Sequence, residues 1–248
     1  MLILALDTST AAVTAALHDG SAVLAERTAL DARKHAELLA PSVDQVLAEA
    51  GAGVGDLTAV VVGVGPGPFT GLRVGLVTAR VLGAALGVDV HGVCSLDVLA
   101  AAADAGETGV DFLVATDARR REVYWARYVR DGDAGPRRVD GPRVDLPREV
   151  PSAGLPVVGR GAALYPEQFG DAVGPLEPSA AALAGLAARW LRDGVEGPRA
   201  PGTGREPQVR TPDGKGPVPF GLLPPEPLYL RRPDAMTPGA RKRVLGRA

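Results

Sequence analysis

The sequence predicts an α/β protein whose mixed sheets are flanked by helices, and three neighbouring segments carry this prediction. The β-branched apolar run at 60–64, VVVGV, is typical of a strand that is covered on both faces. Leucines and small residues then recur at helical spacing over 70–86, and residues 88–93 return to a strand pattern. Strands that alternate with helices in this way indicate a sheet with helices packed on its faces.

The segments before and after this unit extend the same pattern. An apolar strand is expected over 2–6, followed by a hairpin that joins 12–17 to 22–27 through Asp19-Gly20, a strong two-residue hairpin signal. The spacing predicts a helix over 35–50 that ends at Gly51, and another over 95–105 with Ser95 as its N-cap.

The second half of the chain resembles a shortened copy of the first, although no sequence repeat supports it. Strands are expected over 111–116, 122–130, 137–144 and 156–159, and helices over 161–169 and 179–193. The chain therefore divides into four parts: an N-terminal lobe at 1–105, a shortened C-terminal lobe at 106–196, a flexible Pro/Gly-rich linker at 197–226, and a returning strand with a basic tail at 227–248.

Composition limits the class of protein. The 248 residues carry a net charge of −2, so the chain as a whole is not a polycation that would bind nucleic acid unaided. A single cysteine, Cys94, excludes an intrachain disulfide and suits a reducing compartment, and its apolar neighbours indicate a buried thiol. No segment has the pattern of a membrane span or of a secretory signal, so a soluble cytoplasmic protein with no membrane partner is expected.

The glycine-rich turn after the valine strand is the first candidate binding site. Gly65, Gly67 and Gly71 lie between the end of a strand and the start of a helix, where backbone N–H groups converge and can bind phosphate. Asp7, Thr8 and Ser9 follow the first strand and could add hydroxyl groups and a carboxylate that orients a hydrated cation. The alternative is a close-packed turn without a ligand, in which Asp7 caps its own turn.

The two segments together resemble the TsaB family, whose members belong to the actin, Hsp70 and sugar-kinase superfamily. The resemblance is carried by LDTST around residue 7 and GVGPGPFTGLRVGL at 63–76, with lesser matches in Ser95-Leu96-Asp97, at 117–119 and at 227–231. Most of the matching motifs lie within residues 1–130, and few lie beyond residue 130. The resemblance implies an actin-like fold with two related lobes.

The resemblance also implies a function and a set of partners. Members of this family are expected to act as non-catalytic subunits in the synthesis of N6-threonylcarbamoyladenosine (t6A37) in tRNA, dimerising with and activating the catalytic homologue TsaD. Further implied partners are the ATPase subunit TsaE, tRNA bound through the complex, and a second copy of the chain. ATP or ADP with Mg²⁺ could lie at the subunit junction, although no cofactor is expected to be bound firmly.

No catalytic or metal-binding residue is predicted. The three histidines do not lie three or four residues apart, which is the spacing that a helical metal site needs, and His35 is interpreted as a polar residue near a helix start. Two other functions remain open. A small-molecule kinase or ATPase of the same superfamily would need a second phosphate hairpin, and the arginine-rich segment 117–121 is the place to look for it. A metalloprotease is the less favoured of the two, because this sequence lacks a set of residues with metal-ligand spacing.

The helices at 35–50 and 70–86 are the expected partner interface. Their apolar character extends around much of the helix at 70–86, which indicates full burial or participation in an interface. The residues predicted to form this patch or the core beneath it are Leu39, Val43, Val46, Leu72, Arg73 and Leu76. Arginines at 119–130 and in the tail could contact tRNA phosphate, or form a solvated face.

Overall fold

Three antiparallel strands followed by two parallel ones make the first sheet of the computed structural model, which describes residues 1–103, 105–130, 135–152, 154–194 and 218–230. Its strands are β1 (Ile3–Asp7), β2 (Ala12–His18), β3 (Val23–Leu30), β4 (Ala59–Gly63) and β5 (Asp89–Val93), in the order β3-β2-β1-β4-β5. β4 runs parallel to both β1 and β5, and all of its residues are buried, as its valine run predicts.

The second sheet repeats this arrangement. Its strands are β6 (Asp111–Asp117), β7 (Val123–Arg130), β8 (Pro136–Asp145), β9 (Val157–Val158) and β10 (Ala172–Val173), in the order β10-β9-β6-β7-β8. In both sheets the first strand is central, the second and third extend antiparallel on one side, and the fourth and fifth extend parallel on the other. The fold is therefore the predicted actin-like one, with two related lobes of which the second is shortened.

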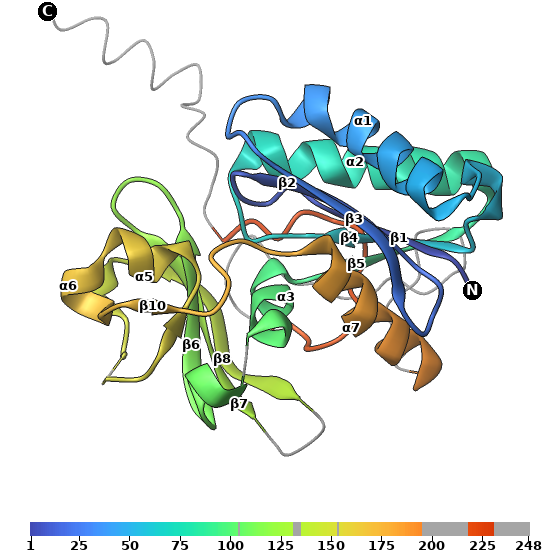
Figure 1. Ribbon diagram of the computed structural model, residues 1–248. Coiled ribbons are helices and arrows are strands. Elements are labelled where there is room, and N and C mark those ends of the chain that lie inside the picture. Colours follow the sequence, from blue (N-terminus) through green and yellow to red (C-terminus); the bar gives the residue numbers. More distant parts are fainter. Residues whose placement is uncertain (104, 131–134, 153, 195–217, 231–248) are drawn as a thin grey trace, which may run out of the picture.

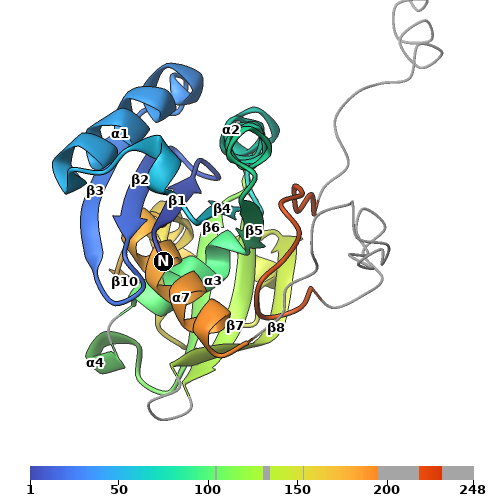
Figure 2. The ribbon, with the colours of Figure 1, turned by 90° about the vertical axis from the view of Figure 1, so that its right-hand side faces the viewer.

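Helices cover both faces of the first sheet (Figures 1 and 2). The helices are α1 (His35–Ala50), α2 (Phe69–Leu86), α3 (Ser95–Ala102), α4 (Ala105–Thr108), α5 (Arg160–Leu164), α6 (Pro166–Phe169) and α7 (Ala180–Arg192), with single 3₁₀ turns at Val54–Asp56 and Pro147–Glu149. α1 and α2 lie on one face, and α3 and α7 lie on the other. α3 also contacts β6, β7 and β8, so it is the layer shared by the two sheets.

The two-residue period of the strands explains this sandwich. On β1, Leu4 and Leu6 belong to the apolar cluster of α1 and α2, whereas Ile3 and Ala5 belong to the cluster of α7. Each large apolar side chain buried in this way stabilises the fold by about 1.5–3 kcal/mol relative to exposure. Residues 3–6 of this central strand are therefore all apolar, because both faces are covered, and the strand ends at the polar residue Asp7.

Helix α7 lies where the sequence did not place it. The sequence groups residues 106–196 as the second lobe, but α7 packs against β1 and β2 of the first sheet. Its start at Ser179 is confirmed, since the Ser179 hydroxyl accepts a hydrogen bond from the Ala182 amide at 3.1 Å. The carboxylate of Glu26 on β3 binds the same end of the helix, accepting from the Ala181 amide and from the Ser179 hydroxyl.

Two predicted helices differ in their bounds. The helix expected over 161–169 is divided into α5 and α6 at Tyr165, because the residue before a proline is disfavoured in helical conformation and Pro166 begins the second piece. α3 ends at Ala102 rather than at 105.

The last described segment, residues 218–230, packs on the edge of the first sheet. Leu223 and Gly92 of β5 exchange both backbone hydrogen bonds, and the Leu228 amide donates to the Val64 carbonyl at 2.8 Å. Leu223 is buried, so the expectation of a flexible linker is wrong for 218–226. Strand-like pairing lies at Leu223 rather than over 227–231, and the remainder of the predicted linker and the basic tail lie outside the described residues.

Candidate functional site

The fold brings the two halves of the predicted phosphate site together. β1 and β4 are parallel neighbours, so the loop after Asp7 and the turn at 65–71 meet at the same edge of the sheet. All six predicted residues, Asp7, Thr8, Ser9, Gly65, Gly67 and Gly71, are buried there. The question is whether their polar groups face a ligand or one another.

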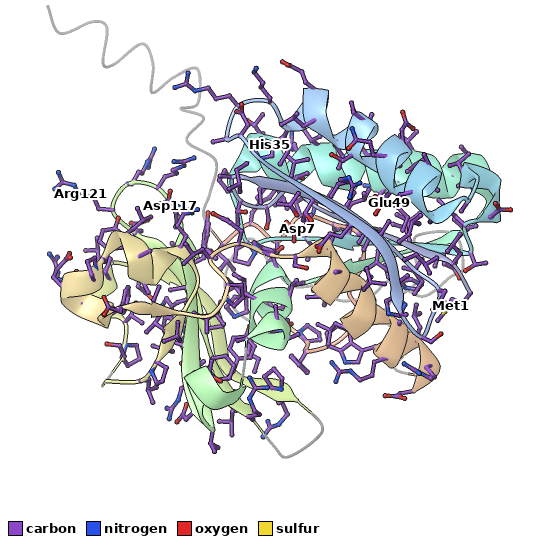
Figure 3. All side chains as sticks on the ribbon, in the orientation of Figure 1. Met1, Asp7, His35, Glu49, Asp117 and Arg121 are labelled. Carbon is purple, nitrogen blue, oxygen red and sulfur yellow. The ribbon has the colours of Figure 1, made fainter. Side chains whose placement is uncertain are left out.

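Asp7 is a structural hydrogen-bond acceptor. One of its carboxylate oxygens accepts from the Ser9 amide at 2.7 Å, and the other accepts from the Ser95 hydroxyl at 2.8 Å. Its side chain is buried below the surface (Figure 3), and burial raises the pKa of the carboxyl above its ordinary value. No arginine or lysine pairs with it among the described residues, so Asp7 joins two loops and does not face solvent.

Ser95 is the residue of this site that sequence reasoning misassigned. It was expected to cap α3, but the N-cap is Cys94, which makes no side-chain cap, and the Ser95 hydroxyl instead connects β1 to the glycine turn. It donates to Asp7 and accepts from the Gly65 amide at 3.2 Å. The signal that could have found it is its position directly after β5, at the same sheet edge as Asp7.

The glycines make room for these loops. A Cβ at Gly63 would lie 1.9 Å from the Asp7 carboxylate, and one at Gly67 would lie 2.1 Å from the Ser9 carbonyl oxygen. Gly65 has a φ of 89°, in the left-handed region that only glycine enters without strain. The glycine spacing therefore serves the close approach of the Asp7 loop, which is the alternative that the sequence left open.

Thr8 joins the same loop to α2. Its hydroxyl donates to the Gly71 carbonyl at 2.8 Å and accepts from the Gly75 amide at 3.0 Å, two backbone groups that lie about one turn apart in α2. A Cβ at Gly75 would lie 2.6 Å from that hydroxyl. On the neighbouring helix, the buried His35 imidazole donates from Nε2 to the Thr10 carbonyl at 2.7 Å. The side chains of Thr8 and His35 therefore both hydrogen-bond to backbone groups of this chain.

A cavity of about 260 Å³ lies between the lobes, beside this loop but lined by other residues. The lining residues are Thr10, Ala11, Leu30, Asp31, Ala32, Pro68, Thr116, Asp117, Arg119, Arg160 and Glu177. Its two arginines are paired with carboxylates: Arg119 lies 3.3 Å from Asp117, and Arg160 pairs with Glu177. No group of three His, Cys, Asp or Glu side chains within the described ranges could hold a metal ion.

The segment considered for a second phosphate hairpin forms the turn between β6 and β7. Arg119, Arg120 and Arg121 have φ values of 60°, 55° and 63°, three consecutive left-handed residues without a glycine. The turn is held by the Asp117 carboxylate, which accepts from the Arg119 amide at 2.7 Å, and by the Ala118 amide, which donates to the Glu122 carbonyl. It presents arginine side chains, whereas a phosphate hairpin would present backbone amides.

A second buried polar cluster joins the lobes through Asp97, part of the Ser95-Leu96-Asp97 motif. The Tyr128 hydroxyl donates to its carboxylate at 2.7 Å, and the Arg138 guanidinium lies 3.5 Å away. Arg138 also donates to the carbonyls of Val218 and Pro219. Burial raises the pKa of Asp97 to about 6, although the nearby guanidinium opposes the rise, and burial raises the pKa of the Cys94 thiol to about 12. The thiol is buried, as the sequence predicts.

The predicted interface residues lie mostly in the core. Leu39, Val43, Val46, Leu72 and Leu76 are buried, so they form the core beneath a patch rather than the patch itself. Arg73 is exposed; its guanidinium stacks on the Phe69 ring at 3.7 Å and donates to the Tyr229 hydroxyl at 2.9 Å.

The exposed side of α2 carries different apolar residues. Phe69, Val77 and Val81 expose 42%, 58% and 61% of their surface, and α2 lies at the margin of the molecule with the sheet on its inner side (Figure 2). The row of Gly71, Gly75, Ala79 and Gly83 faces inward and is buried. Among the described residues α2 alone is long and apolar enough to cross a membrane, which differs from the expectation that no segment has this pattern. Packing of its inner row on β4 and β5 accounts for only part of that apolarity.

Comparisons with known proteins agree with this architecture. A family profile described as "TsaD: tRNA N6-adenosine threonylcarbamoyltransferase" matches residues 23–159. A protein of Escherichia coli named tRNA threonylcarbamoyladenosine biosynthesis protein TsaB is 40% identical over 133 residues, which are 53% of this chain and 56% of that protein. The chain belongs to the TsaB family.

Other relatives of this TsaB-family chain match over more of its length. An uncharacterized protein of Mycobacterium tuberculosis is 45% identical over 239 residues, which are 94% of this chain and 93% of that protein. A solved structure of YeaZ from Pseudomonas aeruginosa superposes with a TM-score of 0.66 at 32% identity, and the match covers 78% of this chain and 93% of that one. Matches of this extent cover both lobes.

Proposed function

We propose that this TsaB-family chain acts in tRNA threonylcarbamoyladenosine biosynthesis as a non-catalytic subunit, which docks on a TsaD-type enzyme through the outer face of α2 and activates it. Support for the pathway comes from the names of the TsaB relatives, and support for the homologous partner comes from the family profile, which is named for the transferase. The observation that carries the docking role is the exposed apolar side of α2: Arg73 and Tyr229 stack on Phe69, whereas Val77 and Val81 stay 58% and 61% exposed in the described part of the chain.

The polar residues that would bind phosphate or a cation in a kinase make hydrogen bonds within this chain. Asp7, Thr8 and Ser95 hydrogen-bond to one another's loops and to the start of α2, so they do not face the cavity with free acceptors or donors. This arrangement supports a subunit whose polar loops set its shape. It gives no support to a phosphoryl-transfer site built from the motif.

Assembly with the TsaD-type protein of the same organism tests the docking role. In the double variant Val77→Glu/Val81→Glu, two side chains that are about 60% exposed become charged. Burying that remaining apolar area in an interface would be worth about 2–4 kcal/mol for the pair, so assembly should weaken at least about 30-fold. The isolated variant should unfold at the same denaturant concentration as the parent chain, because both side chains already face water.

The matched control is Val110→Glu, which changes a valine that is 67% exposed just before β6 in the other lobe. Light scattering of the mixtures should show a heterocomplex for the parent and for the control, and separate chains for the α2 variant. A heterocomplex of undiminished affinity with Val77→Glu/Val81→Glu would refute docking through this face. Phosphoryl transfer by the isolated chain would favour the kinase alternative.

A further inference from the structure

Basic side chains lie on both sides of the mouth of the interlobe cavity. On the first lobe, Asp31 and Ala32 line the cavity and are followed directly by Arg33 and Lys34, which are exposed. On the second lobe, Thr116, Asp117 and Arg119 line the cavity, and exposed Arg120 and Arg121 complete the turn. Figure 3 shows His35, the residue after Lys34, on the first lobe and Arg121 on the second lobe, both on the upper side of the view. We call Arg33, Lys34, Arg120 and Arg121 the basic rim.

The turn that carries the arginines exposes their side chains to solvent. Left-handed conformation costs a residue with a Cβ roughly 1–2 kcal/mol, and three consecutive arginines adopt it. The cost is met by hydrogen bonds of the turn itself, including the Glu122 amide to the Arg119 carbonyl at 3.0 Å. A strained turn with exposed guanidinium groups at the edge of a cavity points to recognition of an anion.

The interior of the cavity does not suit that anion. Three carboxylates, those of Asp31, Asp117 and Glu177, line it, and both of its arginines, Arg119 and Arg160, are already paired. No aromatic side chain is among the lining residues that the structure describes, so there is no platform on which a base could stack. Positive charge lies on the rim and negative charge inside, so the anion must extend across the mouth instead of entering.

We propose that the basic rim binds the phosphate backbone of an RNA strand, a role that rests on the proposed function in tRNA modification and adds a direct RNA contact on this subunit. Guanidinium and ammonium groups on two lobes match the repeating phosphates of a strand, and such contacts are sequence-independent. The chain then contributes to substrate binding as well as to assembly of the complex.

Salt-dependent binding of fluorescently labelled tRNA to the full chain tests this role. Variants Arg33→Gln/Lys34→Gln and Arg121→Asn each remove charge from one lobe, and asparagine tolerates the left-handed conformation of position 121. The control is Arg137→Asn, an exposed arginine on β8 paired with Val129, at the opposite end of the strands from the turn and roughly 20 Å from it.

Combining the two rim variants should weaken tRNA binding at least about 10-fold at low salt and reduce the slope of log affinity against log salt by about 0.7–0.9 for each lost contact, whereas Arg137→Asn should change neither. The proposal is overturned if the parent chain does not bind tRNA, or if the rim variants bind like the control. It is also overturned if tripolyphosphate binds as tightly as tRNA, or if polyglutamate of equal charge displaces tRNA as well as unlabelled tRNA does. Heterocomplex formation, measured with the α2 variants, tests the proposed function separately.

Discussion

Replacement of Thr8 by valine tests whether the Thr8 hydroxyl has a structural role or binds a ligand. Valine has nearly the same shape as threonine, so the variant removes the hydroxyl and keeps the packing. In the folded chain that hydroxyl is buried and binds the Gly71 carbonyl at 2.8 Å and the Gly75 amide at 3.0 Å. Both backbone groups lose this side-chain hydrogen bond at once.

The expected cost follows from burial. A buried donor or acceptor that is left without a partner costs about 1–3 kcal/mol. Gly71 and Gly75 are four residues apart in α2 and could regain part of this by bonding to each other, but the valine methyl would stand where the hydroxyl stood. We therefore expect Thr8→Val to lower the free energy of unfolding by about 1–3 kcal/mol, which corresponds to a fall in melting temperature of very roughly 2–12 °C for a chain of this size.

Urea denaturation followed by circular dichroism measures this change. The control is Thr8→Ser, which keeps the hydroxyl, loses one methyl group, and should therefore retain both backbone contacts at a cost of about 1 kcal/mol. A free energy of unfolding for Thr8→Val within about 0.5 kcal/mol of the parent value would refute the structural role. Stabilisation of the parent by nucleotide, abolished in Thr8→Val, would return Thr8 to a phosphate site.

Two further substitutions test the buried polar clusters. Gly63→Ala would place a Cβ 1.9 Å from the Asp7 carboxylate, so the loop must move; we expect a loss of about 1–3 kcal/mol in urea denaturation, and a stability equal to that of the parent would contradict the close approach. Asp97→Asn tests the effect of pH. Burial raises the pKa of Asp97 from 3.8 to about 6, so the protonated carboxyl is favoured in the folded chain. The resulting contribution to the free energy of unfolding is fully present below pH 3.8 and is lost as pH rises through 6. This difference in pKa corresponds to about 3 kcal/mol. The stability of the parent relative to Asp97→Asn should therefore fall by that amount between about pH 4 and pH 7, and a difference independent of pH would show that Asp97 titrates normally.

Much of the fold could be predicted because the local signals agree with one another. The bounds of α1 were predicted correctly since Gly51, at a φ of 66°, ends the helix where the apolar stripe ends. The duplication of the lobes could not be detected by sequence repetition, since even the equivalent central strands β1 and β6 share buried apolar character rather than a run of identical residues. The place of α7 depends on Leu183 and its neighbours meeting β1, a contact between residues far apart in the chain.

The candidate site shows a different limit. The sequence predicts that Asp7 and the glycine turn belong to one site, and the structure places both at one edge of the sheet. The sequence could not show that Ser95, 88 residues away, supplies the Asp7 carboxylate with a hydrogen bond. Periodicity also failed to separate the inner and outer rows of α2, since both are apolar. One signal was present: at about 100° per residue, Val77 and Val81 lie on the opposite side of the helix from Gly75 and Ala79, and a row of small residues marks the side that the sheet approaches.

The central claim is that this chain contributes a surface to tRNA modification and no chemistry of its own. A reconstituted assay of threonylcarbamoyladenosine formation, with the TsaD-type enzyme held constant and this chain titrated, tests it most directly. We predict that Asp7→Asn supports the same maximal rate as the parent, whereas Val77→Glu/Val81→Glu at equal concentration restores little activity. A rate abolished by Asp7→Asn in a folded, fully assembled complex would contradict the account.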